Sequence, residues 1–345
     1  MQRLSELLKY VDKQAPGIEI APYFNPALPK SAGYHTLTVD VFDTESLRTY
    51  AAKDPHIPAD RIPEIETVDL VGDASGLEDL LRSSGQDGEI SHIVSSHNFE
   101  HLPNPIKFLQ GCAAVLKSGG MLSMAVPDCR ASFDHFRMPT RLGDWLTAYF
   151  ADARQPRAET LFDLMSSRAA FLKNGRAETS CNLAMDQAEN FTLIGDLQTA
   201  YDRFQSEIRA PGPYMDCHCT VMFPESLELM LRDLRHLGLI DLEIVEISPT
   251  HGHEFFVHLR KVTTDSHQME TNYALTRERL MRDISRKIGA APFAARSLFG
   301  RYGVRRAKRA LQNLFGAFVG QKRIARLRAW NHQRHRLRRI RKAAS

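Results

Sequence analysis

Apolar residues recur at two different spacings over the first 128 positions of the chain. Leu4, Leu7, Leu8 and Val11 follow a helical spacing and predict a helix over residues 2–12. Apolar runs bounded by Gly, Pro or Asp predict strands over residues 17–20, 34–40, 66–71, 90–95 and 121–126. The segments between them predict helices over residues 44–53, 77–81 and 104–116. Helix and strand therefore alternate through short links, as in a parallel sheet covered by helices on both faces.

Capping residues mark the starts of two of these helices. Thr44 is the predicted N-cap of the helix over residues 44–53, with Glu45 in its first turn. Asn104 is the predicted N-cap of the helix over residues 104–116, and Pro105 suits its first helical position.

Two further strands are predicted after a helix over residues 225–237. They cover residues 239–247 and 254–262, and they flank a Pro-Thr-His-Gly turn that makes them an antiparallel hairpin. The predicted fold class is therefore α/β: a doubly wound, mostly parallel, seven-stranded Rossmann-like sheet whose last strand is antiparallel.

The rest of the chain divides into an insertion and an extension. Residues 138–215 are polar and helix-like, without a convincing strand, and we interpret them as an insertion that covers a site. The predicted domains are residues 1–265, which hold the sheet, and a basic helical extension over residues 266–345. Apolar residues recur in that extension at helical spacing among arginines, at Val304, Ala307, Leu311, Leu314 and Phe318.

Charge is distributed unevenly between these parts. Residues 286–345 contain 18 Lys or Arg and no Asp or Glu, so the remainder holds 45 − 18 = 27 basic against 41 acidic residues. A basic tail on an acidic body indicates an anionic partner, such as lipid headgroups, nucleic acid, an acidic glycan or another protein. The alternative is a solvated tail that only aids solubility. Because apolar residues interleave with the arginines, the pattern favours a membrane surface over a nucleic-acid duplex.

Cysteine count and hydropathy restrict the compartment. The five Cys residues are an odd number and are scattered, which fits a reducing environment better than secretion. The sequence shows no apolar run of about 18 residues and no signal-peptide core at its N-terminus. We therefore expect a cytoplasmic protein that can lie peripherally at the inner face of a membrane.

Acidic residues follow the first three predicted strands. In an open parallel sheet, ligands bind beyond the carboxyl ends of the strands, where the strand order reverses. Asp40 comes 40 − 19 = 21 residues after Glu19, the spacing expected for a carboxylate that accepts from both hydroxyls of a ribose. Asp73 could accept from an adenine amino group. For each acid the alternative is a helix cap or a turn former.

Residues 90–128 carry the most specific pattern: a strand, a Glu-His-Leu turn, a helix, a Leu-Lys-x-Gly-Gly turn, a strand and a Pro-Asp ending. This segment resembles the class I S-adenosylmethionine-dependent methyltransferases, and the resemblance extends over about residues 16–262. It implies S-adenosylmethionine as the cofactor and methyl transfer to a small molecule or glycan, most simply at oxygen. It also implies a role in cofactor binding for Glu19, Ala21, Asp40, Asp73, Ser96 and His97.

The first turn departs from that family's pattern. Where the family has Glu-x-Gly-x-Gly, this chain has Glu19-Ile20-Ala21-Pro22-Tyr23. Glycine lets the backbone approach a ligand closely, so Ala21 and Tyr23 reduce that access. The alternative function is a non-catalytic, methyltransferase-like binding module recruited by its basic tail.

A hydroxyl acceptor benefits from a general base. His218, in the segment Asp216-Cys217-His218-Cys219, and Asp128, after the fifth strand, are the predicted catalytic residues; His97 and His135 are the other candidates. For a lone His the alternative is a structural role. Asp134 and Arg137 are expected to form an ion pair.

A zinc signature competes with this interpretation. His97, Glu100 and His101 match His-x-x-Glu-His, which requires a continuous helix, yet a strand precedes them and Pro103 follows. Cys217 and Cys219 are too closely spaced for a zinc knuckle. We therefore expect no metal. Because the sheet domain is acidic, we do not expect nucleic acid as the substrate.

Overall fold

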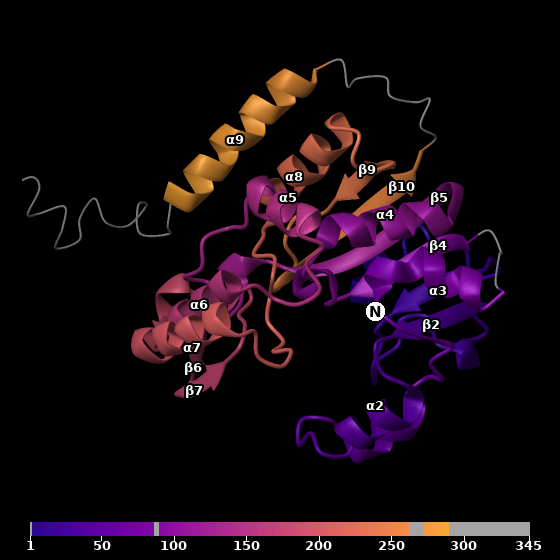
Figure 1. Ribbon diagram of the computed structural model, residues 1–345, viewed down its shortest axis with the longest axis horizontal. Helices are drawn as coiled ribbons and strands as arrows, with labels where there is room; N and C mark the ends of the chain where they lie inside the picture. The colour runs from indigo at the N-terminus through magenta and orange to yellow at the C-terminus, as the bar shows by residue number, and fades with distance from the viewer. Residues whose placement is uncertain (1, 86–89, 263–271, 290–345) are drawn as a thin grey trace, which may run out of the picture. The chain divides into compact units, whose positions relative to one another are not determined.

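The computed structural model describes residues 2–85, 90–262 and 272–289 (Figure 1). The first compact unit of the chain ends at Ile284, and all of the sites below lie in it. The predicted amphipathic helix around Val304–Phe318 and nearly all of the basic tail lie outside the described residues. Within the described ranges, no helix combines the length and the apolar character needed to cross a bilayer.

A seven-stranded sheet forms the centre of the domain, in the order β3-β2-β1-β4-β5-β10-β9. Its strands are β1 (Gly17–Ile20), β2 (Thr36–Asp40), β3 (Leu70–Val71), β4 (Ile90–Ser96), β5 (Leu116–Pro127), β9 (Leu242–Ile247) and β10 (Glu254–Lys261). The first five strands pair in parallel, and β10 is antiparallel to both β5 and β9. The predicted fold class is confirmed, including the antiparallel last strand.

Side chains alternate across the sheet between two cores, as the period of a strand requires. Ile93 of β4 and Val126 of β5 pack into the larger core, while their chain neighbours Val94 and Ala125 pack into a smaller core on the opposite face. Phe256 of β10 joins the smaller core. Both faces are therefore closed to water, which fixes the register of the central strands.

The helices divide between these two faces. The larger core contains residues of α3 (Leu77–Ser83), α4 (Pro105–Val115), α5 (Leu142–Phe150) and α8 (Pro224–His236). The smaller core contains Leu7 of α1 (Gln2–Leu7). The predicted caps of α4 are confirmed, since the Asn104 side chain accepts a hydrogen bond from Lys107 N at 3.2 Å and Pro105 opens the helix.

Several predicted boundaries differ from the observed ones, the start of β5 at Leu116 instead of residue 121 among them. The first helix ends at Leu7, although Leu8 and Val11 still pack against the smaller core. The N-cap of α2 (Thr44–Ala51) is Asp43, not Thr44 as predicted, because the Asp43 carboxylate accepts from Ser46 N at 2.7 Å.

Strand β3 is shorter than predicted for a local reason. It covers only Leu70–Val71, whereas the sequence predicted residues 66–71. Just before it, Asp69 N still donates to Thr38 O at 2.9 Å, but Thr38 N donates to the Asp69 carboxylate at 2.7 Å instead of to a main-chain oxygen. A polar side chain that competes with the backbone ends the regular pairing.

The insertion contains strands that the sequence pattern did not predict. Besides α6 (Ala158–Ser167) and α7 (Leu197–Arg209), it holds a three-stranded antiparallel sheet in the order β7-β6-β8. Its strands are β6 (Ala169–Lys173), β7 (Arg176–Glu178) and β8 (Phe191–Leu193). The expectation of an insertion without strands was wrong, because β7 is exposed along its whole length and three-residue strands carry almost no alternating signal.

The last described helix, α9 (Tyr273–Gly289), contacts α8 at the Asp233 carboxylate and at His236, whose ring stacks on Tyr273 with the ring centres 3.8 Å apart. Tyr273 Oη donates to Asp233 Oδ1 at 2.7 Å, and Arg277 pairs with the same carboxyl group at 3.1 Å. The domain boundary predicted at residue 265 remains a prediction.

Candidate functional site

The strand order reverses between β1 and β4, and the turn after β1 has an unusual backbone. Ala21 and Tyr23 have φ angles of 49° and 50°, in the left-handed region that normally favours glycine. Ala21 N donates to Val39 O of β2 at 2.8 Å, so this conformation is tied to the neighbouring strand. The turn keeps a glycine-like path although it lacks both glycines.

Glu19 lies on β1 directly before this turn and is only 3% exposed. Its carboxylate accepts from Ala27 N at 2.6 Å and from Leu28 N at 2.9 Å. Burial raises the pKa of Glu19 to about 7, while the two N–H groups favour the charged form. Glu19 therefore fixes the loop that follows the turn. With a pKa of about 7, its carboxyl group is partly protonated at neutral pH.

Asp40 and Asp73 lie at the same end of adjacent strands, since Asp40 pairs with Val71 in the parallel register of β2 and β3. Asp40 is buried and accepts from Phe42 N at 3.0 Å, and burial raises the pKa of its carboxyl group. Asp73 is exposed, and its carboxylate accepts from Ser75 N at 2.8 Å. Asp73 thus also caps the short helix Ala74–Gly76.

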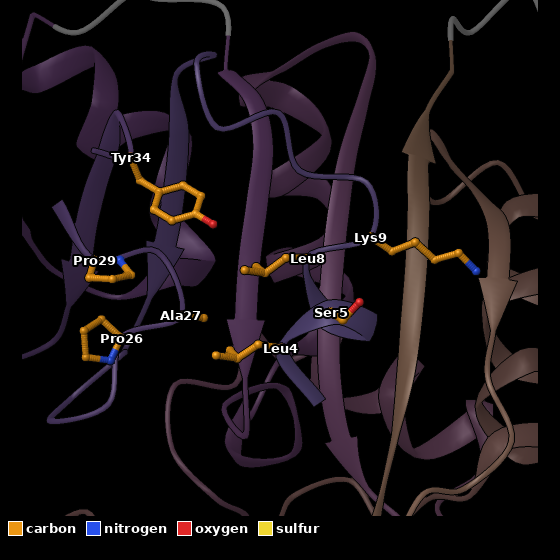
Figure 2. A pocket seen from close by; sticks show the side chains of 8 residues that line it. All are labelled: Leu4, Ser5, Leu8, Lys9, Pro26, Ala27, Pro29 and Tyr34. Atoms are coloured by element: carbon orange, nitrogen blue, oxygen red, sulfur yellow. The ribbon is translucent and has the colours of Figure 1, made fainter. Parts of the chain in front are cut away.

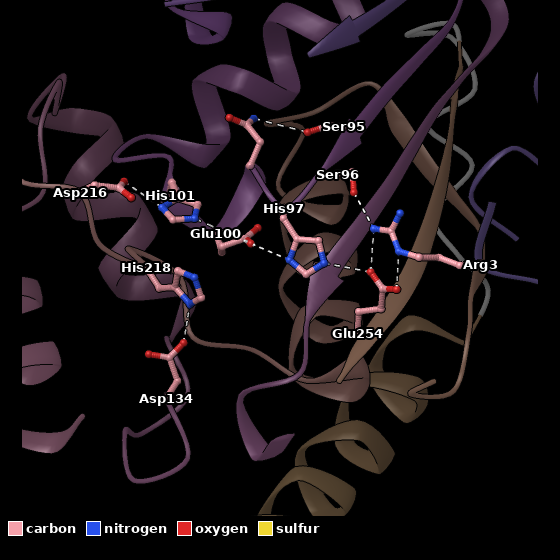
Figure 3. A network of polar contacts seen from close by, with 11 residues as sticks. Arg3, Ser95, Ser96, His97, Glu100, His101, Asp134, Asp216, His218 and Glu254 are labelled. Carbon is pink, nitrogen blue, oxygen red and sulfur yellow. Dashed lines mark hydrogen bonds and ion pairs between the residues drawn. The ribbon is translucent and has the colours of Figure 1, made fainter. Parts of the chain in front are cut away.

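Ser96 and His97 belong to a polar network at the end of β4, drawn in Figure 3. Arg3 donates to Ser96 Oγ at 2.8 Å and binds the Glu254 carboxylate with two hydrogen bonds of 2.7 and 2.9 Å. His97 has a φ of 50°, and its Nε2 lies 2.9 Å from Glu254 Oε2. The network therefore joins α1, β4 and the first residue of β10.

The charges in this network support one another. Burial opposes a charge on the His97 ring, but the carboxylates of Glu100 and Glu254 raise its pKa to about 9. Burial likewise opposes ionisation of Glu254, yet His97 and Arg3 lower its pKa to about 2. His97 is therefore a cation near neutral pH and does not act as a base there.

Asp128 is completely buried at the end of β5, and its two oxygens are occupied. Oδ1 accepts from Arg130 Nε at 2.9 Å, and Oδ2 accepts from Arg130 Nη2 and from Thr250 Oγ1, both at 2.5 Å. This geometry ties β5 to the turn before β10. Both carboxylate oxygens of Asp128 are therefore already bound to donors within the protein.

His218 is buried and paired with Asp134. Its Nδ1 lies 2.5 Å from Asp134 Oδ2, while Asp134 Oδ1 accepts from Arg137 Nη1 at 2.6 Å. The expected ion pair of Asp134 and Arg137 is confirmed. Burial opposes the charge of Asp134, but His218 and Arg137 lower its pKa. Arg137 also donates to the carbonyl oxygen of His218 at 3.0 Å, so ring and backbone are both fixed.

His101 lies beside this pair. The centres of the His101 and His218 rings are 4.8 Å apart, edge to face, and His101 Nδ1 lies 2.8 Å from Asp216 Oδ1. The remaining candidate, His135, donates to Arg130 O and stacks on Phe191, which is a structural role. Of the four predicted bases, only His218 has a buried carboxylate partner together with a second nitrogen left for chemistry.

Sequence reasoning missed two members of the site. Arg3 and Glu254 meet across 251 positions of the chain, and neither stands in a recognisable motif. Glu100 and His101 entered the sequence analysis as part of the Glu-His-Leu turn and of the zinc signature, and neither was predicted as a site residue. That signature does not form a helix, because β4 ends at Ser96 and only a short 3₁₀ turn, Phe99–His101, follows.

A groove of about 640 Å³ lies between α1 and the loop over residues 26–34 (Figure 2). Its lining is mixed: apolar residues such as Leu4, Leu8 and Tyr34 stand beside the polar side chains of Ser5 and Lys9. None of the predicted site residues lines this groove.

Comparisons with known proteins concern the fold alone. No family model matches the chain, and no curated protein matches its sequence. Solved structures that it is similar to include the CcbJ methyltransferase from Streptomyces caelestis, 13% identical, with a TM-score of 0.39 over 76% of this chain and 89% of that one. The glycopeptide N-methyltransferase MtfA complexed with sinefungin is 12% identical, with a TM-score of 0.35 over 74% and 91%. The PH0226 protein from Pyrococcus horikoshii OT3 is 14% identical, with a TM-score of 0.37 over 75% and 90%.

The sheet itself supports the fold independently of these scores. Its strand order, with the reversal between β1 and β4 and the antiparallel β10 inserted next to β5, agrees with the fold predicted from the sequence. The chain has the fold of the class I S-adenosylmethionine-dependent methyltransferases.

Proposed function

We propose that the chain is an S-adenosylmethionine-dependent methyltransferase that acts on a hydroxyl group of a small-molecule or glycan acceptor. The turn after β1 carries this proposal. Ala21 and Tyr23 keep a left-handed backbone at the point where the strand order reverses. A left-handed alanine or tyrosine costs about 1–2 kcal/mol, so a turn that keeps this path has a reason beyond local stability.

The cofactor would lie across the ends of β1, β2 and β4. Asp40 would accept hydrogen bonds from the ribose hydroxyls, and Asp73 from the adenine amino group. Ser96 and His97 would line the pocket, and Glu19 and Ala21 would face the methionine part. The buried Asp40 carboxyl group fits a ligand diol, since a donor from outside would satisfy an oxygen that the protein only partly satisfies.

The chemistry needs few groups from the protein. S-adenosylmethionine supplies a methyl group on a sulfonium, which departs as a neutral thioether when a nucleophile attacks in line. His218 Nε2 would accept the proton of the acceptor hydroxyl as the oxygen forms its bond to carbon. Asp134 would hold the Nδ1 proton of His218 and stabilise the imidazolium, and Asp128 would position the loop after β5. Alignment of acceptor and methyl supplies much of the remaining rate.

Calorimetric titration with S-adenosylmethionine and with S-adenosylhomocysteine tests this proposal. We expect one binding site for each ligand. Absence of binding by both would leave the alternative, a binding module that uses the fold as a scaffold. Turnover is then measured with hydroxylated small molecules and glycans, by release of S-adenosylhomocysteine.

The charge of the basic tail suggests where in the cell the protein works. We propose that the protein works in the cytoplasm and lies on an anionic membrane surface through its tail. Deleting residues 286–345 should abolish sedimentation with phosphatidylglycerol vesicles while leaving thermal unfolding of the sheet domain unchanged. A truncated protein that still sediments with these vesicles would contradict this role.

A further inference from the structure

Three side chains from two distant segments meet beside the proposed site. Glu100, His101 and His218 each offer one ligand atom, and these three atoms lie within 4.8 Å of one another. The two segments are tied by the backbone, because the carbonyl oxygen of Glu100 accepts from Cys219 N at 2.6 Å and from Thr220 N at 3.0 Å. The cluster therefore depends on main-chain pairing as well as on side-chain rotamers.

Glu100 is the unusual member. It is 0% exposed, and among the described residues neither of its carboxylate oxygens makes a hydrogen bond. Its ion-pair contacts are His97 Nδ1 at 3.3 Å and His101 Nε2 at 3.9 Å. The His97 cation offsets part of the desolvation cost of this buried carboxylate, and a metal ion bound on its other side, toward His101 and His218, would offset more of it.

Both histidines are already oriented by carboxylates. Nδ1 of His101 lies 2.8 Å from Asp216, and Nδ1 of His218 lies 2.5 Å from Asp134 (Figure 3). Each carboxylate favours a proton on Nδ1, so that on metal binding Nε2 of each ring would be the nitrogen that supplies the lone pair. Histidines that ligate metals almost always donate their other N–H to such a partner, which fixes tautomer and ring orientation.

We propose that Glu100, His101 and His218 bind a divalent transition metal, zinc in the first instance. Two imidazoles and one carboxylate with an open fourth position form a recognised zinc donor set. The site is not the His-x-x-Glu-His signature, because His97 Nε2 is held by Glu254. Against the sequence expectation of no metal, His218 supplies the second imidazole from 117 positions after His101.

The site also deepens the proposed function, and in this respect it rests on that function. Zinc on His218 Nε2 would take the lone pair that base catalysis uses. The acceptor hydroxyl would then bind at the open position and lose its proton because the metal lowers its pKa. Metal-bound and metal-free protein would thus activate the same hydroxyl by different means.

Metal titration of the full chain tests the site without cofactor or acceptor. After treatment with a chelator, we expect one zinc equivalent by calorimetry and elemental analysis, and a cobalt(II) visible spectrum of tetrahedral type. Glu100→Gln and His101→Gln should each weaken zinc binding at least 100-fold, and Asp216→Asn by about 10- to 100-fold. The exposed His56→Gln is the matched control and should bind zinc as the parent does.

Thermal unfolding keeps the test decisive. Without metal, Glu100→Gln loses the ion pair with His97 and should melt at a lower temperature than the parent, so each protein is compared with its own metal-free form. Zinc should raise the melting temperature of the parent only. Zinc binding that survives Glu100→Gln, or that is lost only on Cys217→Ser and Cys219→Ser, would overturn the site. Parent protein that binds S-adenosylmethionine but no zinc would overturn the site alone, whereas zinc binding without cofactor binding would overturn only the proposed function.

Discussion

His218 and Asp134 lie 84 positions apart in the chain, yet His218 Nδ1 is 2.5 Å from Asp134 Oδ2 in a buried setting. Asp134→Asn should keep the contact with Arg137 through its amide oxygen while presenting an N–H to His218. The ring would then carry its proton on Nε2 and could not act as a base. We expect kcat for methyl transfer to fall by about 10²- to 10⁴-fold, with the affinity for S-adenosylmethionine unchanged. Steady-state kinetics checks this, with the exposed Asp60→Asn as control. An unchanged kcat would exclude the pair from the reaction.

Two Asp–Arg pairs, each formed by residues three positions apart, differ in burial and therefore in how much they contribute to the free energy of unfolding. The Asp134–Arg137 side chains are 1% and 4% exposed, whereas the Asp144–Arg141 side chains are 44% and 83% exposed. Arg137→Met leaves the buried Asp134 carboxylate with His218 as its remaining partner, and we expect the free energy of unfolding to fall by about 3 kcal/mol, the lower end of the range for a broken buried pair. Arg141→Met should change it by less than about 1 kcal/mol. Urea denaturation of the two variants side by side makes the comparison, and equal losses would contradict the burial argument.

Asp40 is the position at which cofactor binding is most directly tested. Asp40→Ala should weaken S-adenosylmethionine binding by about 1–3 kcal/mol, from the loss of charged hydrogen bonds. Asp40→Asn keeps an acceptor for Phe42 N and serves as the conservative variant. Calorimetry on both variants measures the effect, and parent-like affinity in Asp40→Ala would remove this residue from the cofactor site.

Glu19 makes stability depend on pH. Its pKa is raised to about 7 in the folded protein from 4.5, so its contribution is fully present below pH 4.5 and is lost as pH rises through about 7. A shift of that size corresponds to on the order of 3 kcal/mol. The free energy of unfolding of the parent, minus that of Glu19→Gln, should therefore decline by roughly this amount between pH 4.5 and 8. Chemical denaturation across this range decides it, and a flat difference would show that Glu19 keeps an ordinary pKa.

The sequence predicted all seven strands of the large sheet, because apolar runs bounded by Gly, Pro or Asp mark their positions even where a strand is short. Residues 17–20 were predicted to the residue, and Asn104 with Pro105 located the start of α4. Tertiary pairing decided the rest. Asp69 shortened β3 by hydrogen bonding to Thr38 from another strand, and the exposed β7 carries no alternating pattern.

The candidate site was predictable only in its local parts. The residues at strand ends follow from topology, and Asp134 and Arg137 are three positions apart, so their pair was predicted. The contacts of His218 with Asp134 and of Arg3 with Glu254 join distant segments. Sequence spacing cannot predict contacts between such distant segments. The role of Glu100 depends on its burial, which only the folded chain creates.

The bridge between Arg3 and Glu254 has a consequence for biosynthesis. A nascent chain leaves the ribosome from its N-terminus, so Arg3 emerges long before the residue 251 positions later that it binds. Arg3 of α1 can form this contact only after β10 has joined the sheet between β5 and β9. The polar network at the end of β4 can assemble only when nearly the whole domain has been translated, which keeps incomplete chains from presenting a finished site.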